Sequence, residues 1–152
     1  MIINSVTIVL HVLSVVVWVG GMFFAYMAMR PAALKLEPPQ RLMLWSETFE
    51  RFFPWVWGSV VVLPFTGYWM IFSMFGSFDS TPLYALIMQY IGLVMIAIFL
   101  HVFFAPYRRL RRFVAAEDFP AAGKQLAQIR KLIALNLSLG LITVILASSR
   151  AI

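Results

Sequence analysis

Four long apolar runs, none interrupted by Asp, Glu, Lys or Arg, constrain this sequence more than any other feature. A helix needs about 20 apolar residues, at about 1.5 Å each, to cross about 30 Å of hydrocarbon. Lipid offers no hydrogen-bond partner to an open strand edge, so such runs must be helices. The sequence therefore predicts an all-α fold, an integral membrane antiparallel four-helix bundle. The runs are Ile3–Met29, Phe53–Phe75, Leu83–Pro106 and Leu132–Ala147.

Composition agrees with lipid as the main solvent of the chain. Hydrophobic residues make up 62% of the sequence and charged residues 12%, whereas soluble domains are about 45–50% apolar and about 25% charged. The first apolar stretch follows no basic segment and is too long for a signal peptide, so we expect a retained helix. The fourth helix can begin as early as Phe119, with Asp118 as its N-cap and Pro120 in its first turn. We expect a single membrane domain over residues 1–152, with spans at about 3–29, 53–75, 83–106 and 128–149.

Basic residues gather on one side of the predicted membrane. Of the 12 Lys and Arg residues, all but Arg150 fall in or beside the first and third connections. The positive-inside rule then places both connections in the cytoplasm and both termini outside. The basic segment PYRRLRRF is predicted to anchor this topology, with the lipid bilayer as partner and no nucleic acid. Residues 40–53 are predicted to form a short amphipathic helix on the membrane surface.

Two histidines, His11 and His101, lie inside the apolar runs. Ionisable residues in a membrane are costly and mark functional sites by default. Carboxylate pairs are absent from the runs and the chain has no cysteine, so carboxylate acid–base and thiolate chemistry are excluded there. We expect His11 about 12 Å below the outer boundary and His101 about 25 Å below it, too far apart in depth to share one metal. His101 is expected to bond to Asn136 or to a helix-end carbonyl.

A stripe of ligand-like side chains follows His11 along the first helix. Imidazole and thioether groups suit copper(I), and both serve as axial ligands of haem, although a methionine stripe is also ordinary packing. We expect Trp18, and Gln89 from the third helix, to line a cofactor together with His11. The candidate metal ligands are His11, Met22 and His101. The full stripe is His11, Ser14, Trp18, Met22, Ala25 and Met29, with Gly20 and Gly21 beside it.

Two segments resemble known membrane proteins. LHVLSVVVWVGGMFF resembles the first helix of the CopD (copper resistance D) family and is similar to that of HemJ-type protoporphyrinogen oxidases. ERFFPWVWGSVVVLPFTGYWMI resembles the second-helix region of CopD-like proteins. The CopD resemblance implies copper uptake across the inner membrane and covers the four-helix portion of a family whose full-length members have further helices.

The HemJ resemblance carries over only in part. It implies that His11 stands at the histidine that HemJ-type proteins link to haem b. Their important third-helix lysine is Gln89 here, and the tyrosine of their tyrosine–histidine pair is Leu100 before His101. The loss of that lysine argues against the HemJ enzyme activity.

Three functions stay open from the sequence. The leading one is a CopD/HemJ-like protein that binds haem b or copper through His11 in redox or metal handling. The second is copper transfer across the membrane without haem. The third is a non-catalytic accessory subunit of a larger membrane complex, with structural histidines. The residues do not decide whether the chain is an enzyme, and self-association is compatible with each function.

Overall fold

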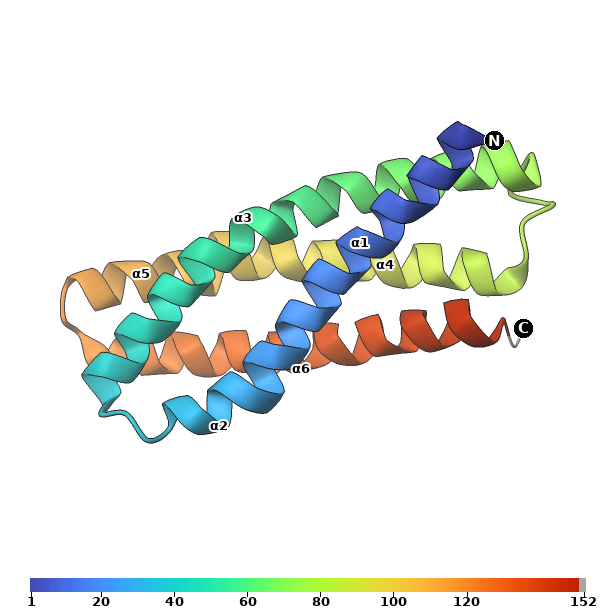
Figure 1. Ribbon diagram of the computed structural model, residues 1–152. Coiled ribbons are helices and arrows are strands. Elements are labelled where there is room, and N and C mark those ends of the chain that lie inside the picture. The colour runs from blue at the N-terminus through green and yellow to red at the C-terminus, as the bar shows by residue number, and fades with distance from the viewer. Residues whose placement is uncertain (151–152) are drawn as a thin grey trace.

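The computed structural model describes residues 1–150, and this part of the chain is helical with no strand. Figure 1 shows four long helical spans packed side by side. All four are long and apolar enough to cross a membrane. The predicted all-α membrane fold is therefore confirmed. The four spans are Ile2–Ala33, Pro38–Phe75, Leu83–Ala115 and Phe119–Ser149.

Three of the four spans contain a five-residue π-helical turn, a feature that is often found at functional sites. In order along the chain, the elements are α1 (Ile2–Phe24), η1 (Ala25–Met29), α2 (Arg30–Ala33), α3 (Pro38–Met70), η2 (Ile71–Phe75), α4 (Leu83–Val102), η3 (Phe103–Tyr107), α5 (Arg108–Ala115) and α6 (Phe119–Ser149).

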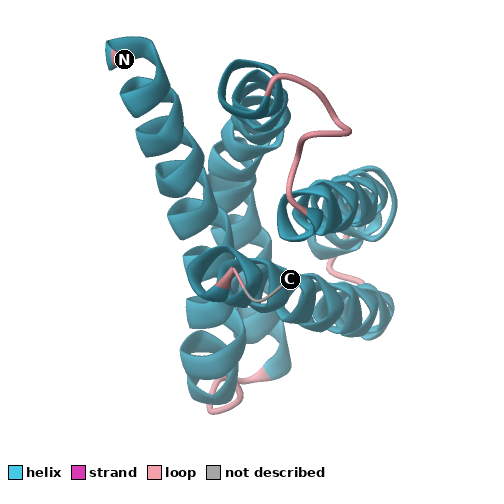
Figure 2. Cartoon of the chain, turned by 90° about the vertical axis from the view of Figure 1, so that its right-hand side faces the viewer, coloured by secondary structure: helices cyan, strands magenta, loops and turns pink. Residues whose placement is uncertain are grey.

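The two ends of the bundle differ in charge. Both termini and the α3–α4 connection lie at one end, which we call the terminal end (Figure 1). The α2–α3 and α5–α6 connections lie at the opposite end, with the basic residues around them, and we call it the basic end. Successive spans therefore run in opposite directions. Figure 2, seen from the terminal end, shows the N-terminal part of α1 leaning away from α4.

The predicted surface helix at residues 40–53 is wrong, because this segment is the first part of α3. Its apolar side chains recur every three or four residues and are buried in the bundle. Such a stripe packs against neighbouring helices when these are present, so the segment continues along the bundle as part of α3. The buried residues are Leu42, Trp45, Phe49 and Phe53.

The spans also extend past the apolar runs at the third connection. The basic segment that was expected to connect helices is helical, because α4 continues through η3 into α5. The predicted cap of the fourth helix is confirmed. The Asp118 carboxylate accepts a hydrogen bond from the Ala121 N–H at 3.4 Å, and α6 begins at Phe119.

Aromatic rings fill the core toward the basic end. Phe53 stacks on Phe49 with ring centroids 5.0 Å apart, and it meets Tyr107 edge-on at 4.8 Å and Phe99 at 5.5 Å. Gly21 allows the Phe52 ring to sit directly against α1, as its small size predicts. Apolar packing therefore dominates this half of the bundle, whereas the polar contacts between α1 and α3 lie toward the terminal end.

Candidate functional site

His11 is hydrogen-bonded across the α1–α3 interface. Its Nδ1 lies 2.7 Å from the Oγ1 of Thr66, a buried residue of α3. The same hydroxyl lies 2.7 Å from the Val62 carbonyl oxygen and 3.2 Å from that of Leu63. A hydroxyl has one proton, and here it donates to its own helix, so it accepts from His11. The imidazole therefore carries its proton on Nδ1 and presents the lone pair of Nε2.

A glycine brings a third helix to the histidine. A methyl group added to the buried Gly67 would lie 2.9 Å from Gln89 Oε1 and 3.7 Å from His11 Cε1. The imidazole from α1 and the amide from α4 thus meet over bare backbone of α3. The expected neighbourhood of His11 and Gln89 agrees with this arrangement. Any larger residue at position 67 would push the amide away.

A polar seam along α1 and α3 continues from His11 in both directions. Toward the terminal end, Asn4 Oδ1 accepts hydrogen bonds from Trp69 Nε1 at 3.3 Å and from Ser73 Oγ at 3.0 Å. Toward the core, Ser59 Oγ donates to the carbonyl of Ser14 at 3.1 Å. We use the name polar seam for the residues Asn4, Thr7, His11 and Ser14 of α1 with Ser59 and Thr66 of α3 and Ser73 of η2.

Sequence reasoning found His11 and Gln89 but missed the α3 side of the seam. The signal was present in the spacing, because Ser59, Thr66 and Ser73 recur every seven residues. Seven residues are close to two helical turns, so the spacing puts the three hydroxyls on one face of the span Pro38–Phe75.

The other predicted ligands lie away from His11. Trp18 is buried and packs edge-on against Phe99, with ring centroids 6.3 Å apart. Met22 is buried as well. Along a helix, these residues stand about 10 Å and about 16 Å from His11. The structure thus gathers Trp18 and Met22 into the aromatic core and not around the imidazole.

His101 is exposed on α4, and its expected bond to Asn136 is wrong. The Asn136 side-chain amide donates to the Met95 carbonyl at 3.1 Å instead. Asn136 is buried against the backbone of α4, whereas the His101 side chain is exposed. Within residues 1–150, no group of three or more His, Cys, Asp or Glu residues is placed to hold a metal. His11 is thus the histidine that lies inside a polar contact network.

The packing around His11 does not fit a haem group. The imidazole and the Gln89 amide fill the space above Gly67. A cavity of about 260 Å³ lies at the basic end and begins at Ala25, which is about 21 Å along the helix from His11. A second hollow is lined by α3 and η2 between Pro64 and Ser73, and His11 does not border it.

The sequence profile described as copper resistance protein D (CopD) matches residues 46–150, more than half of the chain. The chain belongs to the CopD family. The expected resemblance to CopD is thereby confirmed, and that to HemJ-type proteins stays a prediction. The CopD match includes Thr66, Gly67 and Gln89 and begins after the helix that carries His11. No curated protein and no solved structure gives a match to the chain.

Proposed function

We propose that this CopD-family chain handles copper at the bacterial inner membrane and contacts the ion, as cargo, through His11 Nε2. One observation carries the proposal: the Nδ1 hydrogen bond to Thr66, 2.7 Å long, fixes the tautomer in which Nε2 is free to bind a metal. The family description supports copper as the ion. Imidazole is a suitable copper ligand in either oxidation state.

Each residue of the site then has a separate role. Thr66 orients the imidazole, as hydrogen-bond partners of metal-binding histidines do. Gln89 offers an amide oxygen near the ring, on the same side of Gly67 as the imidazole. Asn4 and Ser73 provide polar atoms between the terminal end and His11. A site with few ligands suits an ion in transit, because conduction needs binding that is weak enough for release.

Met22 is the proposed next contact for copper on its way through α1. Its thioether is soft and suits copper(I). It is buried about 16 Å further along the helix than His11, so the two side chains would act in turn. In this scheme the exposed His101 has no part in the path.

The orientation that we propose puts the terminal end in the periplasm and the basic end in the cytoplasm. The basic end has eleven of the 12 Lys and Arg residues, with Arg150 alone at the other end. Cytoplasmic segments near membrane helices are enriched in these residues. Copper would then reach His11 from the periplasmic side.

An accessory subunit is the second candidate, and the same seam favours it. Interhelical hydrogen bonds among Ser, Thr, Asn and His side chains also hold membrane helices together without further function. The Asn4–Ser73 and His11–Thr66 contacts are of this kind. On that hypothesis, His11 is structural and binds no metal.

Copper(I) binding by the purified protein separates the two candidates. We expect about one copper per wild-type chain in a reducing buffer with a competing chelator, and loss of that copper in His11→Ala. His101→Gln is the matched control and should bind like the wild type. Circular dichroism and elution volume show that each variant is folded. Equal copper content in His11→Ala, or none in the wild type, would favour the accessory subunit.

A further inference from the structure

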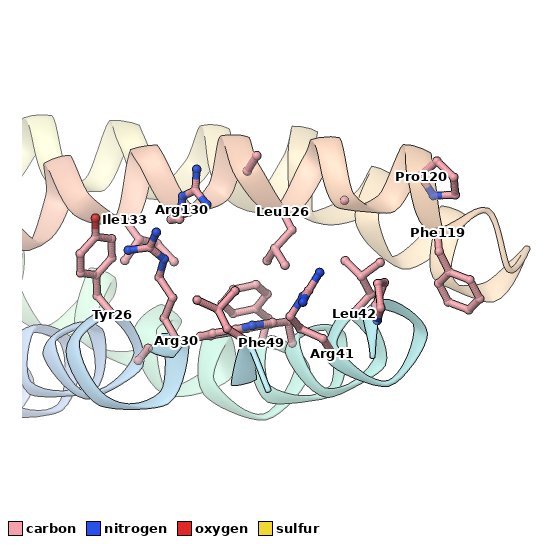
Figure 3. A pocket seen from close by; sticks show the side chains of 16 residues that line it. Tyr26, Arg30, Arg41, Leu42, Phe49, Phe119, Pro120, Leu126, Arg130 and Ile133 are labelled. Carbon is pink, nitrogen blue, oxygen red and sulfur yellow. The ribbon is translucent and has the colours of Figure 1, made fainter. Parts of the chain in front are cut away.

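A cavity of about 260 Å³ lies at the basic end, between α2, the start of α3 and the first half of α6. Figure 3 shows the side chains of Arg30 and Arg41 rising into it from below and Arg130 placed on α6 opposite them. Apolar groups, among them Phe49 and Leu126, form much of the remaining wall. Three separate segments thus bring three guanidinium groups to one partly apolar hollow.

The three arginines have no carboxylate partner among the described residues. The ion pairs there join Arg51 to Glu47 and Arg111 to Glu50. No Asp or Glu borders the cavity within residues 1–150. A hollow lined by charges of one sign attracts an ion of the opposite sign.

The arginines also keep most of their donors free. Arg30 lies over the Tyr26 ring, with its guanidinium carbon 5.0 Å from the ring centroid. Arg41 donates one long hydrogen bond, of 3.4 Å, to the Leu36 carbonyl. A guanidinium group has five N–H donors, so these contacts leave several for a ligand.

We propose that this cavity binds an anionic phospholipid, with the phosphate on the arginines and an acyl chain along the apolar wall. Guanidinium forks match phosphate oxygens in pairs. The cavity opens at the basic end, where the charge pattern places the cytoplasmic leaflet and its anionic lipids. Free phosphate has the same anionic chemistry, but the wall of Phe49 and Leu126 offers it nothing. The cavity lies about 21 Å along α1 from His11, so the lipid site is separate from copper handling.

Lipid titration of the purified, delipidated full chain in neutral detergent tests the proposal. The probes are phosphatidylglycerol, phosphatidylcholine and inorganic phosphate, and binding is read from native mass spectrometry and from the rise in Tm. We expect phosphatidylglycerol to bind about tenfold tighter than phosphatidylcholine, because the choline cation of phosphatidylcholine would be held close to three guanidinium groups that repel it. Inorganic phosphate should have little effect at the same concentration. Equal binding of both lipids would overturn charge recognition, and an equal effect of inorganic phosphate would overturn the lipid.

Two variants test whether the lipid binds in this cavity, and a third serves as their control. Arg41→Gln with Arg130→Gln should weaken phosphatidylglycerol binding about tenfold or more, because charge-assisted hydrogen bonds are lost. Gly123→Leu should also weaken it, since Gly123 borders the cavity and a methyl group there would meet nothing within 4 Å. This second variant adds an apolar side chain at the cavity wall without removing charge, and its first carbon has open space.

The matched control is Arg51→Gln with Lys131→Gln, which removes two charges of the basic end outside the cavity wall. It should bind phosphatidylglycerol like the wild type. If the control weakens binding as much as Arg41→Gln with Arg130→Gln, net charge explains the effect and the cavity has no special role. Wild-type binding by a folded Gly123→Leu protein would overturn the location.

Discussion

Thr66 Oγ1 accepts the Nδ1–H of His11 across 2.7 Å while it donates to a carbonyl of its own helix, also at 2.7 Å. The backbone of α3 thereby fixes the proton on the imidazole of α1. The contact between α1 and α3 therefore decides which imidazole nitrogen is free to bind a metal. Each of the two residues can be substituted without the other.

Thr66→Val should lower copper(I) affinity while it preserves the fold. Valine keeps the shape of threonine but offers no oxygen, so the imidazole is free to change tautomer. Loss of such a partner typically lowers metal affinity about 10–100-fold. The free energy of unfolding should fall by about 0.6 kcal/mol, and by at most about 1.7 kcal/mol. A competition titration against a copper(I) chelator measures the affinity.

Thr66→Ser is the control for this change, because it restores the hydroxyl. Its copper affinity should return to that of the wild type. An unchanged affinity in Thr66→Val would show that the hydrogen bond to His11 has no part in metal binding.

The number of helices followed directly from the sequence, but their ends did not. Apolar runs mark the length that can sit in hydrocarbon, whereas a helix continues as long as one face can pack. Trp45 and Phe49 lie among polar residues, yet both are buried because their spacing puts them on the side of α3 that meets the other helices. The polar residues between them led to the wrong prediction of a surface helix.

Gly67→Ala should weaken copper binding through Gln89. The added methyl group would lie 2.9 Å from Gln89 Oε1, closer than real side chains come, so the amide must move. The methyl group would also lie 3.7 Å from His11 Cε1, an ordinary contact. The amide oxygen ends a flexible side chain and can move at low cost, so we expect the unfolding free energy to stay within about 1 kcal/mol of the wild type and the copper affinity to fall, both measured in the same detergent.

Gly58→Ala is the matched control on the same helix, because a methyl group there meets nothing within 4 Å. It should raise stability slightly, by about 0.5–1 kcal/mol, as alanine favours helix over glycine. Combining Gly67→Ala with Gln89→Ala should lower the copper affinity no further than Gln89→Ala does alone, since the displaced atom is gone. Strict additivity of the two changes would contradict the contact.

The sequence predicted part of the candidate site, namely His11, but not its hydrogen-bond partner Thr66. His11 stood out because an apolar helix leaves few polar groups to choose from. Thr66 did not, because threonine is common in membrane helices and its partner depends on how two helices rotate. The same unknown rotation misled the pairing of His101 with Asn136: residue depth follows from counting along a helix, but the direction of a side chain depends on packing.

His101→Gln should leave both copper binding and stability unchanged. The side chain is exposed on α4 and makes no hydrogen bond within residues 1–150. Exposed substitutions away from special features usually change the unfolding free energy by at most about 0.5 kcal/mol. Copper content per folded chain and the Tm are the measurements. A loss of copper in a folded His101→Gln protein would assign this histidine a role that its placement does not explain.

Reporter fusions should place both termini outside the cytoplasm. The basic end has a net charge of +6, from eleven basic residues and the five acidic residues Glu37, Glu47, Glu50, Glu117 and Asp118, whereas Arg150 and Asp79 cancel at the terminal end. The opposite orientation would put the basic end outside, against the general excess of Lys and Arg on the cytoplasmic side of membrane proteins. A periplasm-active enzyme fused after residue 152 should be active, and the same enzyme inserted between Leu36 and Glu37 should be inactive. A cytoplasm-active reporter at the two positions should give the reverse pattern. If the C-terminal fusion is active only in the cytoplasm, the orientation is inverted, and copper would reach His11 from inside the cell.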